Sequence, residues 1–263
     1  MSTLPTLQEL ESLLRSLRPF LLDPTSVGEV VTKNRNDFVT AADVGVQRRI
    51  REALALSHPH IHVMGEEDAD HSIDPTVPTV VLDPIDGTTN YIFGYGLSAV
   101  SFALVQGGQT QLGAVYNPYT DELFAAERGK GATLNGTPIH VLEASAPAEV
   151  VAAIGSMPYR KEFANELFGL AKQLYLECID IRRSGSAALD ICYTAAGRVG
   201  LYCERGLKVW DYAAAALILE EAGGRITDYQ GEPIPLFGGS DIAASNGALH
   251  SYLLATLAQR CTL

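Results

Sequence analysis

One stretch of the chain, Val80–Asn90, constrains the fold more than any other. A short apolar run there ends in two carboxylates three residues apart, Asp83 and Asp86, with a proline between them. An apolar run that stops at a proline-containing turn is typical of a buried strand. Gly87 and the hydroxyl residues after it predict a helix that begins at Thr88. The two carboxylates are therefore expected at the carboxyl end of a strand, where both can point at one place.

The chemistry of this turn favours a metal ion and a phosphate. Hard oxygen ligands suit Mg²⁺, which takes few protein ligands and keeps positions open for water and phosphate. Gly87 lets the backbone approach an anion closely, and the start of a helix directs N–H groups toward phosphate. The simpler interpretation is an acidic surface turn that caps a helix, because such strings are common in loops. The apolar run before Asp83, expected as a buried strand, and the hydroxyls of Thr88 and Thr89 favour a metal site over such a surface turn.

Carboxylates also stand at the ends of two other predicted elements. Glu66 follows a strand-like alternation, and Asp211 lies in the first turn of an alanine-rich helix that stops at Gly223-Gly224. A negative charge is favoured in the first turn of a helix, so Asp211 taken alone is interpreted as a plain cap. Glu66 taken alone is interpreted as a solvated loop carboxylate. Taken together, three carboxylate-bearing element ends are what metal-dependent phosphate chemistry requires.

These segments, together with Lys33 and the stretch Asp37–Asp43, resemble the inositol monophosphatase family. The resemblance covers nearly the whole chain, in the family's order. The string Asp-Pro-Ile-Asp-Gly-Thr-Thr-Asn at 83–90 is highly specific for the family, and residues 206–211 resemble its bacterial members. The linker from Lys33 to Asp43 is slightly shorter than in animal members. Because that loop covers the site in the family, the presence of a third metal ion stays open.

The resemblance implies roles for individual residues. Asp43 and Thr88, joined by a hydrogen bond, are expected to orient and deprotonate the attacking water, with no covalent intermediate. The expected metal ligands are Glu66, Asp83, the carbonyl of Ile85, Asp86 and Asp211. The expected substrate contacts are Gly87, Thr88, Thr89, Arg183, Glu204 and Asp211, with a solvated helix entry as an equal alternative for Arg183. The resemblance further implies two or three Mg²⁺ ions per site, inhibition by Li⁺ and a homodimer.

Composition argues against several other classes of partner. The chain has 263 residues, 47% of them hydrophobic, and a formal charge of −12. A nucleic acid is not expected as the main ligand, because phosphate backbones require a basic protein face. The apolar runs are too short to cross a bilayer and the first residues are unlike a signal peptide, so we expect a cytoplasmic protein without a membrane partner. Free thiols are expected at Cys178, Cys192, Cys203 and Cys261.

The order of the predicted elements indicates a layered α/β fold. Strands are predicted at 61–65, 79–83, 98–105, 112–117, 122–126, 150–154 and 242–245. Helices are predicted at 7–21, 40–54, 163–174, 186–196, 211–222 and from 247, and a glycine-punctuated loop at 129–136. We expect one catalytic domain, 1–263, with an N-terminal metal-binding subregion at about 1–145 and a C-terminal subregion at about 146–263. The resemblance implies that the layers alternate α-β-α-β-α, as in sugar phosphatases.

The sequence thus predicts a Mg²⁺-dependent phosphomonoesterase. Its expected substrate is a small phosphorylated polyol or sugar, above all myo-inositol monophosphate. One alternative is a phosphatase for 3′-phosphoadenosine 5′-phosphate, NADP or fructose 1,6-bisphosphate. The Thr88-Thr89-Asn90 continuation favours the inositol branch, because the nucleotide branch resembles Gly-Thr-Lys-Glu at this place. A second alternative is a non-catalytic regulatory protein on the same scaffold, against which the intact carboxylate set argues, since unused clustered charges are costly.

Overall fold

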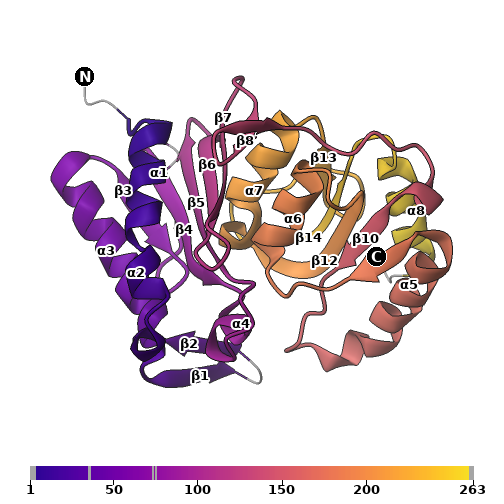
Figure 1. Ribbon diagram of the computed structural model, residues 1–263, viewed down its shortest axis with the longest axis horizontal. Coiled ribbons are helices and arrows are strands. Elements are labelled where there is room, and N and C mark those ends of the chain that lie inside the picture. The colour runs from indigo at the N-terminus through magenta and orange to yellow at the C-terminus, as the bar shows by residue number, and fades with distance from the viewer. Residues whose placement is uncertain (1–3, 35–36, 73, 75, 261–263) are drawn as a thin grey trace.

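Helices and sheets of the chain stack in alternating layers (Figure 1). The computed structural model describes residues 4–260 apart from 35, 36, 73 and 75. One core lies between the N-terminal helices and the first sheet, a second between the two sheets, and a third between the second sheet and the last helices. This arrangement confirms the predicted α/β class and its α-β-α-β-α layers.

The first layer consists of α1 (Leu7–Ser16), α2 (Arg18–Leu21) and α3 (Ala41–Ser57). A single helix was predicted from 7 to 21, and this prediction is wrong in one detail. Proline at position 19 has no N–H to continue the hydrogen-bond ladder, so α1 ends at Ser16 and α2 starts a new turn. The leucine stripe still faces one way, and its members Leu10, Leu14, Leu17 and Leu21 are all buried.

The first sheet has seven strands in the order β3-β4-β5-β6-β7-β8-β9. The strands are β3 (His62–Gly65), β4 (Thr79–Asp86), β5 (Ala99–Gln106), β6 (Gln109–Asn117), β7 (Glu122–Glu127), β8 (Ala132–Leu134) and β9 (Thr137–Ile139). Only the β3–β4 pair is parallel among these described strands. The segment 129–136, predicted as a glycine-punctuated loop, contains the short strand β8, which pairs with β9, while Gly129, Gly131 and Gly136 lie outside the strands.

Both faces of β4 are buried, which explains its uninterrupted apolar sequence. Val80 and Leu82 belong to the core under the N-terminal helices, whereas Val81 belongs to the core between the sheets. Side chains alternate along a strand, so Asp83 continues on the face of Val81. That face is the one covered by α7. The strand therefore directs Asp83 toward the helix that carries the most distant predicted carboxylate, Asp211.

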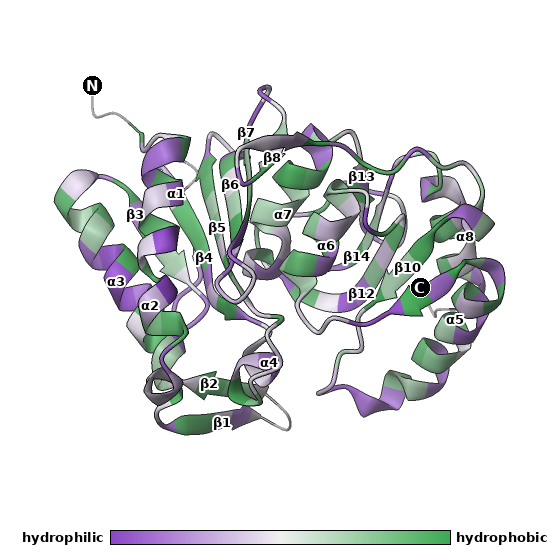
Figure 2. Cartoon of the chain, in the orientation of Figure 1, coloured by the Kyte–Doolittle hydropathy of each residue, from purple (hydrophilic) through white to green (hydrophobic). Residues whose placement is uncertain are grey.

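The middle layer is formed by α6 (Ala187–Ala195) and α7 (Val209–Glu221). Every residue of α7 from Tyr212 to Leu219 is buried, because the helix lies between two sheets. The small alanine side chains of α7 let the helix lie close to the first sheet. A Cβ added to Gly113 of β6 would lie only 2.6 Å from the carbonyl oxygen of Ala214. Figure 2 shows the same pattern, with hydrophobic colour along β4 and β5 and both colours on α1 and α3.

The second sheet has five strands in the order β11-β10-β12-β14-β13. They are β10 (Val151–Ile154), β11 (Asp180–Arg182), β12 (Leu201–Lys208), β13 (Arg225–Thr227) and β14 (Gly239–Ser245). Its outer face packs against α5 (Ala164–Glu177) and α8 (His250–Arg260). Two of these strands, β10 and β14, were predicted. The central strand β12 was not, although it carries Glu204. The expected boundary between the two subregions, near residues 145 and 146, lies in the connection from the first sheet to the second.

Two further elements border the site. Strands β1 (Val30–Asn34) and β2 (Asp37–Thr40) form a hairpin that the sequence did not predict, and the linker residues 35 and 36 lie outside the described part of the chain. The helix α4 (Thr88–Ile92) begins where it was predicted. Cys178, Cys192 and Cys203 are buried and are not in a disulfide, while Cys261 is not among the described residues. Within the described chain, no helix has the length and apolar character needed to cross a membrane.

Candidate active site

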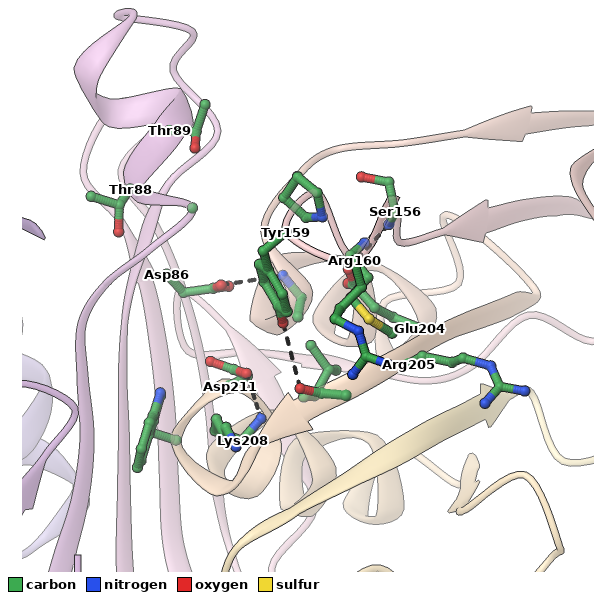
Figure 3. Close-up of a pocket in the computed structure, with 18 of the residues that line it drawn as sticks. Asp86, Thr88, Thr89, Ser156, Tyr159, Arg160, Glu204, Arg205, Lys208 and Asp211 are labelled. Atoms are coloured by element: carbon green, nitrogen blue, oxygen red, sulfur yellow. Dashed lines mark hydrogen bonds between the residues drawn. The ribbon is translucent and has the colours of Figure 1, made fainter. Parts of the chain in front are cut away.

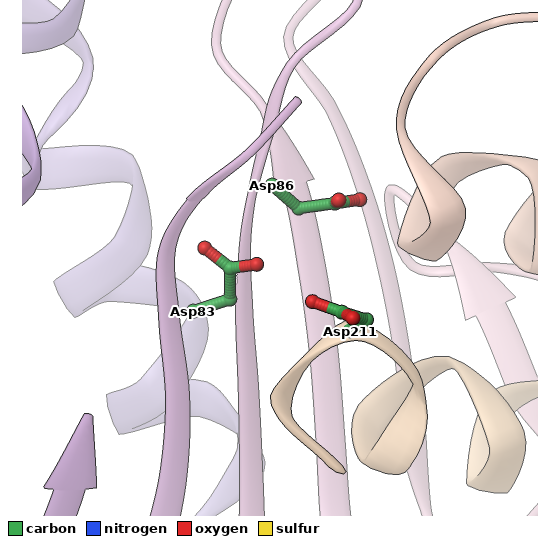
Figure 4. Close-up of side chains that lie close together, drawn as sticks. All are labelled: Asp83, Asp86 and Asp211. Carbon is green, nitrogen blue, oxygen red and sulfur yellow. The ribbon is translucent and has the colours of Figure 1, made fainter. Parts of the chain in front are cut away.

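Three aspartates converge where β4 ends and α7 begins. Asp83, Asp86 and Asp211 each offer a carboxylate oxygen, and these oxygens lie within 4.8 Å of one another (Figure 4). Asp83 and Asp86 are buried, and Asp211 is partly buried. Each has hard oxygen donors of the kind that Mg²⁺ or another hard divalent cation binds. Residues 125 positions apart in the sequence, Asp86 and Asp211, thus meet at one point.

Three carboxylates of the site also accept hydrogen bonds at the starts of helices. Asp43 accepts one from the backbone N–H of Thr40 at 2.8 Å at the start of α3. Asp86 accepts one from Ala188 N–H at 2.7 Å in the first turn of α6, and Asp211 accepts one from Lys208 N–H at 2.7 Å at the start of α7. The positive ends of these helices stabilise negative charge there. These three side chains therefore both accept hydrogen bonds at the start of a helix and belong to the candidate site.

Burial and mutual repulsion disfavour ionisation in this cluster. Burial raises the pKa of Asp83 well above its ordinary value, and the nearby carboxylates of Glu66 and Asp86 raise it further. Burial likewise raises the pKa of Asp211, with Asp86 as the next cause. The pKa of Asp86 rises to about 7, again chiefly through burial. A bound divalent cation would relieve this repulsion, so the cluster fits a metal site.

Glu66 lies near these aspartates but outside the group of three. It follows the end of β3, and its Oε1 accepts a hydrogen bond from Lys33 Nζ at 3.2 Å. The same ammonium lies 2.7 Å from Glu67 Oε1. Burial raises the pKa of Glu66, whereas Lys33 lowers it. The structure therefore places Glu66 beside Asp83 with a lysine as its ionic partner.

The predicted water-activating pair is not joined by a hydrogen bond. Thr88 Oγ1 donates to the carbonyl oxygen of Ile85 at 3.0 Å, and Asp43 Oδ2 accepts from Thr40. The expected contact between Thr88 and Asp43 is thus wrong for this structure. Asp43 Oδ1 is buried and has no hydrogen-bond partner, and burial raises the pKa of Asp43 to about 7. An unpaired buried carboxylate oxygen is costly and is suited to accept a proton or a donor.

A cavity of about 1570 Å³ opens above the aspartates. Its wall includes these predicted residues: Glu66, Asp86, Gly87, Thr88, Thr89, Arg183, Glu204 and Asp211. Asp43, Asp83 and Ile85 are buried and are not part of the wall. Gly87 adopts φ +86°, and a Cβ there would lie 3.0 Å from the carbonyl oxygen of Leu97, so only glycine fits this turn.

Glu204 faces the aspartates across the cavity. Figure 3 shows Asp86 and Asp211 on one side, Glu204 and Arg205 on the other, and Tyr159 between them. Glu204 accepts hydrogen bonds from Tyr202 and from a backbone turn after β10. Burial raises the pKa of Glu204, while the hydrogen bond from Tyr202 lowers it. Arg183 Nη2 donates to Ser156 Oγ at 2.8 Å and lines the same wall.

An aromatic contact joins the two sides of the aspartate cluster. The ring centroids of His71 and Trp210 lie 4.6 Å apart, and His71 Nε2 lies 3.2 Å from the carbonyl oxygen of Glu66. Trp210 directly precedes Asp211, and its carbonyl accepts a hydrogen bond from Ser101 Oγ at 3.0 Å. His71 therefore connects the segment after β3 with the first turn of α7.

Sequence reasoning did not find several residues that shape the site. Ser186 donates to Asp86, and Tyr202 donates to Glu204. Ser186 stands three positions before Leu189, an apolar residue of the helix, so its role as an N-cap could be inferred from the sequence. Its hydrogen bond to Asp86 could not be inferred in this way. Tyr202 belongs to the strand that the sequence did not predict. The loop 156–163 after β10, which forms much of the opposite wall, carries no local signal for such a role.

Comparison with known proteins agrees with this geometry. The family model described as "Inositol monophosphatase family" matches residues 9–262. The chain belongs to the inositol monophosphatase family. Members of this family are metal-dependent phosphatases, and the three-aspartate cluster is consistent with metal binding. Family membership confirms the resemblance from which the site residues were predicted.

Relatives of this inositol monophosphatase family member carry two kinds of name. "Nus factor SuhB" of Salmonella typhimurium strain LT2 is 38% identical over 229 residues, 87% of this chain and 85% of that protein. "Nus factor SuhB" of Escherichia coli strain K12 is 38% identical over 230 residues, with the same coverage of 87% and 85%. Among solved structures, the Thermotoga maritima IMPase has a TM-score of 0.86 at 31% identity, with 96% of each chain covered. The inositol monophosphatase of Anabaena has a TM-score of 0.84 at 32% identity, with 98% covered.

Proposed function

We propose that this chain is a Mg²⁺-dependent phosphomonoesterase that hydrolyses myo-inositol monophosphate or a similar polyol or sugar phosphate. The convergence of Asp83, Asp86 and Asp211 within 4.8 Å carries the proposal. Membership of a phosphatase family supports it. The cavity beside the aspartates has room for a phosphorylated sugar or polyol.

The proposed metal ligands are Glu66, Asp83, the carbonyl of Ile85, Asp86 and Asp211. Two or three Mg²⁺ ions would supply positive charge that neutralises the phosphoryl oxygens and the leaving alkoxide. Asp83 is close to Glu66 as well as to the other two aspartates, so it is the carboxylate best placed for two ions. Burial, followed by repulsion from neighbouring carboxylates, raises the pKa values of Asp83 and Asp211. This supports the assignment, because a bound cation favours the ionised carboxylates.

The remaining residues would bind the phosphate and move the proton of the attacking water. Gly87, Thr88 and Thr89 line the cavity above Asp86 and would hold the phosphate. Asp43 would accept the proton, with its unpaired Oδ1 as the acceptor. Thr88 would orient the water once its hydroxyl leaves the Ile85 carbonyl. Glu204 and Arg183 would contact the alcohol part of the substrate.

Phosphate release measured with and without metal tests this proposal. Treatment with EDTA should abolish the hydrolysis of D-myo-inositol 1-phosphate, and Mg²⁺ should restore it. Full turnover by rigorously metal-free protein would contradict the mechanism. The same assay with 3′-phosphoadenosine 5′-phosphate, NADP and fructose 1,6-bisphosphate separates the alternative substrates. One solved neighbour at 25% identity is titled a dual specific IMPase/NADP phosphatase, which makes NADP the first alternative to measure.

The names of the curated relatives favour a second candidate, a role as a Nus factor. Such a role need not use the metal site. Expression of the wild-type chain and of Asp83→Asn in an Escherichia coli strain that lacks its own SuhB separates the two functions. Rescue by both proteins would support a non-catalytic role, whereas rescue by neither would remove this candidate.

A further inference from the structure

Glu204 is held by three hydrogen bonds from its own chain. Its Oε1 accepts from the consecutive backbone N–H groups of Ser156 and Met157 at 3.1 and 3.3 Å. Its Oε2 accepts from the hydroxyl of Tyr202 at 2.7 Å. Two consecutive N–H groups that point at one oxygen form a small anion-binding concavity. We call Gly155, Ser156, Met157 and Tyr202 the Glu204 cradle.

The backbone of the cradle is shaped for this one side chain. Met157 is buried and adopts φ +40°, a left-handed conformation that is unfavourable for a residue with a side chain. A Cβ added to Gly155 would lie 1.8 Å from Glu204 Cδ, so any larger residue would displace the carboxylate. Tyr202 is 0% exposed. It therefore cannot touch a substrate in the cavity and acts only through Glu204.

The hydrogen bonds of the cradle leave Glu204 with little free capacity. An ionised carboxylate has roughly four acceptor positions on its two oxygens. The cradle occupies three of them, two on Oε1 and one on Oε2. The remaining position, on Oε2, is suited to a single hydroxyl donor from the alcohol part of a substrate. A glutamate without these hydrogen bonds could adopt several side-chain rotamers, whereas the carboxylate of Glu204 presents its acceptor oxygen in one fixed position.

We propose that the Glu204 cradle sets substrate selectivity by fixing this acceptor, and that Tyr202 is its positioning residue. The inference rests on the proposed phosphatase function and deepens it. The preferred substrate class is a phosphate monoester whose alcohol carries a free hydroxyl near the ester. An ester without hydroxyl groups would leave this acceptor of Glu204 unpaired in the occupied cavity and would be disfavoured for that reason.

The test compares two esters on the same ring skeleton, D-myo-inositol 1-phosphate and cyclohexyl phosphate. The selectivity is the ratio of their kcat/KM values with the Mg²⁺-loaded protein. In Tyr202→Phe, this ratio should fall about tenfold, the scale of losing one hydrogen bond to a charged group. The fall should come from the inositol ester, chiefly through KM. Gly155→Ala should lower the ratio in the same direction, because its methyl group displaces Glu204.

Tyr116→Phe is the matched control. Tyr116 is also 0% exposed and donates to a carboxylate, Asp121 Oδ1, at 2.8 Å, but it lies in the first sheet and is not part of the cavity wall. Its selectivity ratio should equal that of the wild type. Thermal unfolding of all three variants checks that they are folded.

Three outcomes would overturn the inference or its basis. Unchanged kcat/KM values for both esters in folded Tyr202→Phe would show that Tyr202 does not position Glu204. An equal loss with both esters would assign Tyr202 a purely structural role and would also overturn it. If the wild-type protein releases phosphate from neither ester, the proposed function itself fails. This outcome is distinguishable from the first two, in which the wild-type protein is active.

Discussion

A cluster of three aspartates and a single glutamate lie on opposite sides of the cavity, and their surroundings differ. Asp83, Asp86 and Asp211 lie close together, and burial together with neighbouring carboxylates raises the pKa of each above its ordinary value. Glu204, on the opposite wall, is surrounded by hydrogen-bond donors of the protein itself. The comparison teaches that the aspartates repel one another in a way that a cation would relieve, whereas the protein's own donors hold Glu204 and leave it one acceptor position.

Asp83→Asn tests the aspartate side and should have the largest effect. We expect turnover to fall by roughly 10³-fold or more, because the loss of several kcal/mol of charge stabilisation has that scale. Mg²⁺ binding measured by calorimetry should weaken at the same time. Asp23→Asn is a suitable control. Asp23 accepts from Thr25 N–H at 2.9 Å, just as Asp83 accepts from Ile85 N–H at 2.9 Å, but Asp23 does not line the cavity. Equal Mg²⁺ titrations for wild type and Asp83→Asn would refute the assignment.

Asp43→Asn tests whether the unpaired buried oxygen accepts a proton. Turnover should fall by about two orders of magnitude or more, the usual scale for losing general-base help. Thr88→Ala should behave similarly, and the double variant should lose less than the sum of the two, because both residues would act on the same water. Single-turnover phosphate release at saturating Mg²⁺ is the measurement. Near-normal turnover in Asp43→Asn would leave Asp43 with a capping role only.

Glu204→Gln tests the opposite wall and should have a smaller, different effect. An amide keeps the shape of the side chain but presents a donor where the cradle supplies donors, so its position will be disturbed. We expect Mg²⁺ affinity to equal that of the wild type, while the preference among alcohols changes by about tenfold. Calorimetric titration with Mg²⁺ and kcat/KM values for several esters measure the two properties separately. Weakened Mg²⁺ binding in this variant would place Glu204 with the aspartates instead.

The stability of the metal-free protein should depend on pH. Burial raises the pKa of Asp43 and Asp86 from the ordinary value of 3.8 to about 7. The folded chain therefore keeps protons that the unfolded chain releases, so this contribution is fully present below about pH 4 and is lost as pH rises through 7. In EDTA, the midpoint of thermal unfolding should be lower at pH 7.5 than at pH 5. Mg²⁺ should reduce this difference, and an identical slope with and without Mg²⁺ would argue against a metal at the aspartates.

Li⁺ should inhibit the enzyme, as an expectation from the family. Li⁺ is close to Mg²⁺ in size but has half its charge. In place of an ion held by Asp83, Asp86 and Asp211, it would stabilise the phosphate and the leaving group less. Inhibition should be uncompetitive or mixed toward substrate. Steady-state rates in rising LiCl, with NaCl matched for ionic strength, test this expectation, and identical rates in both salts would contradict it.

The sequence predicted the first sheet better than the second for a physical reason. The helices around Asp43 and Asp211 and the strand before Asp83 have strong local signals: a capping threonine, an alanine run with a glycine stop, and an apolar run. Strand β12 has no such signal, because Glu204, Arg205 and Lys208 interrupt its apolar residues. Its conformation depends on pairing with β10 and β14, which are distant in sequence. Local patterns cannot report such contacts.

The candidate site was predictable as a set of residues but not as a set of bonds. The family motifs identified Asp43, Glu204 and the other carboxylates by number. They gave no hint that Thr88 donates to the Ile85 carbonyl or that Asp86 caps α6, because these bonds depend on how separate elements pack. The Glu204 cradle was equally hidden, since it joins residues 47 and 48 positions apart in the sequence.

The contact between His71 and Trp210 has an optical consequence. The chain contains a single tryptophan. Its ring lies 4.6 Å from that of His71, and the next residue is Asp211. Selective excitation of indole therefore yields fluorescence from one known place, the junction of the segment after β3 with the first turn of α7. A cation that arrives at the aspartates, or a movement of His71 away from the indole, should change the emission of an unlabelled protein.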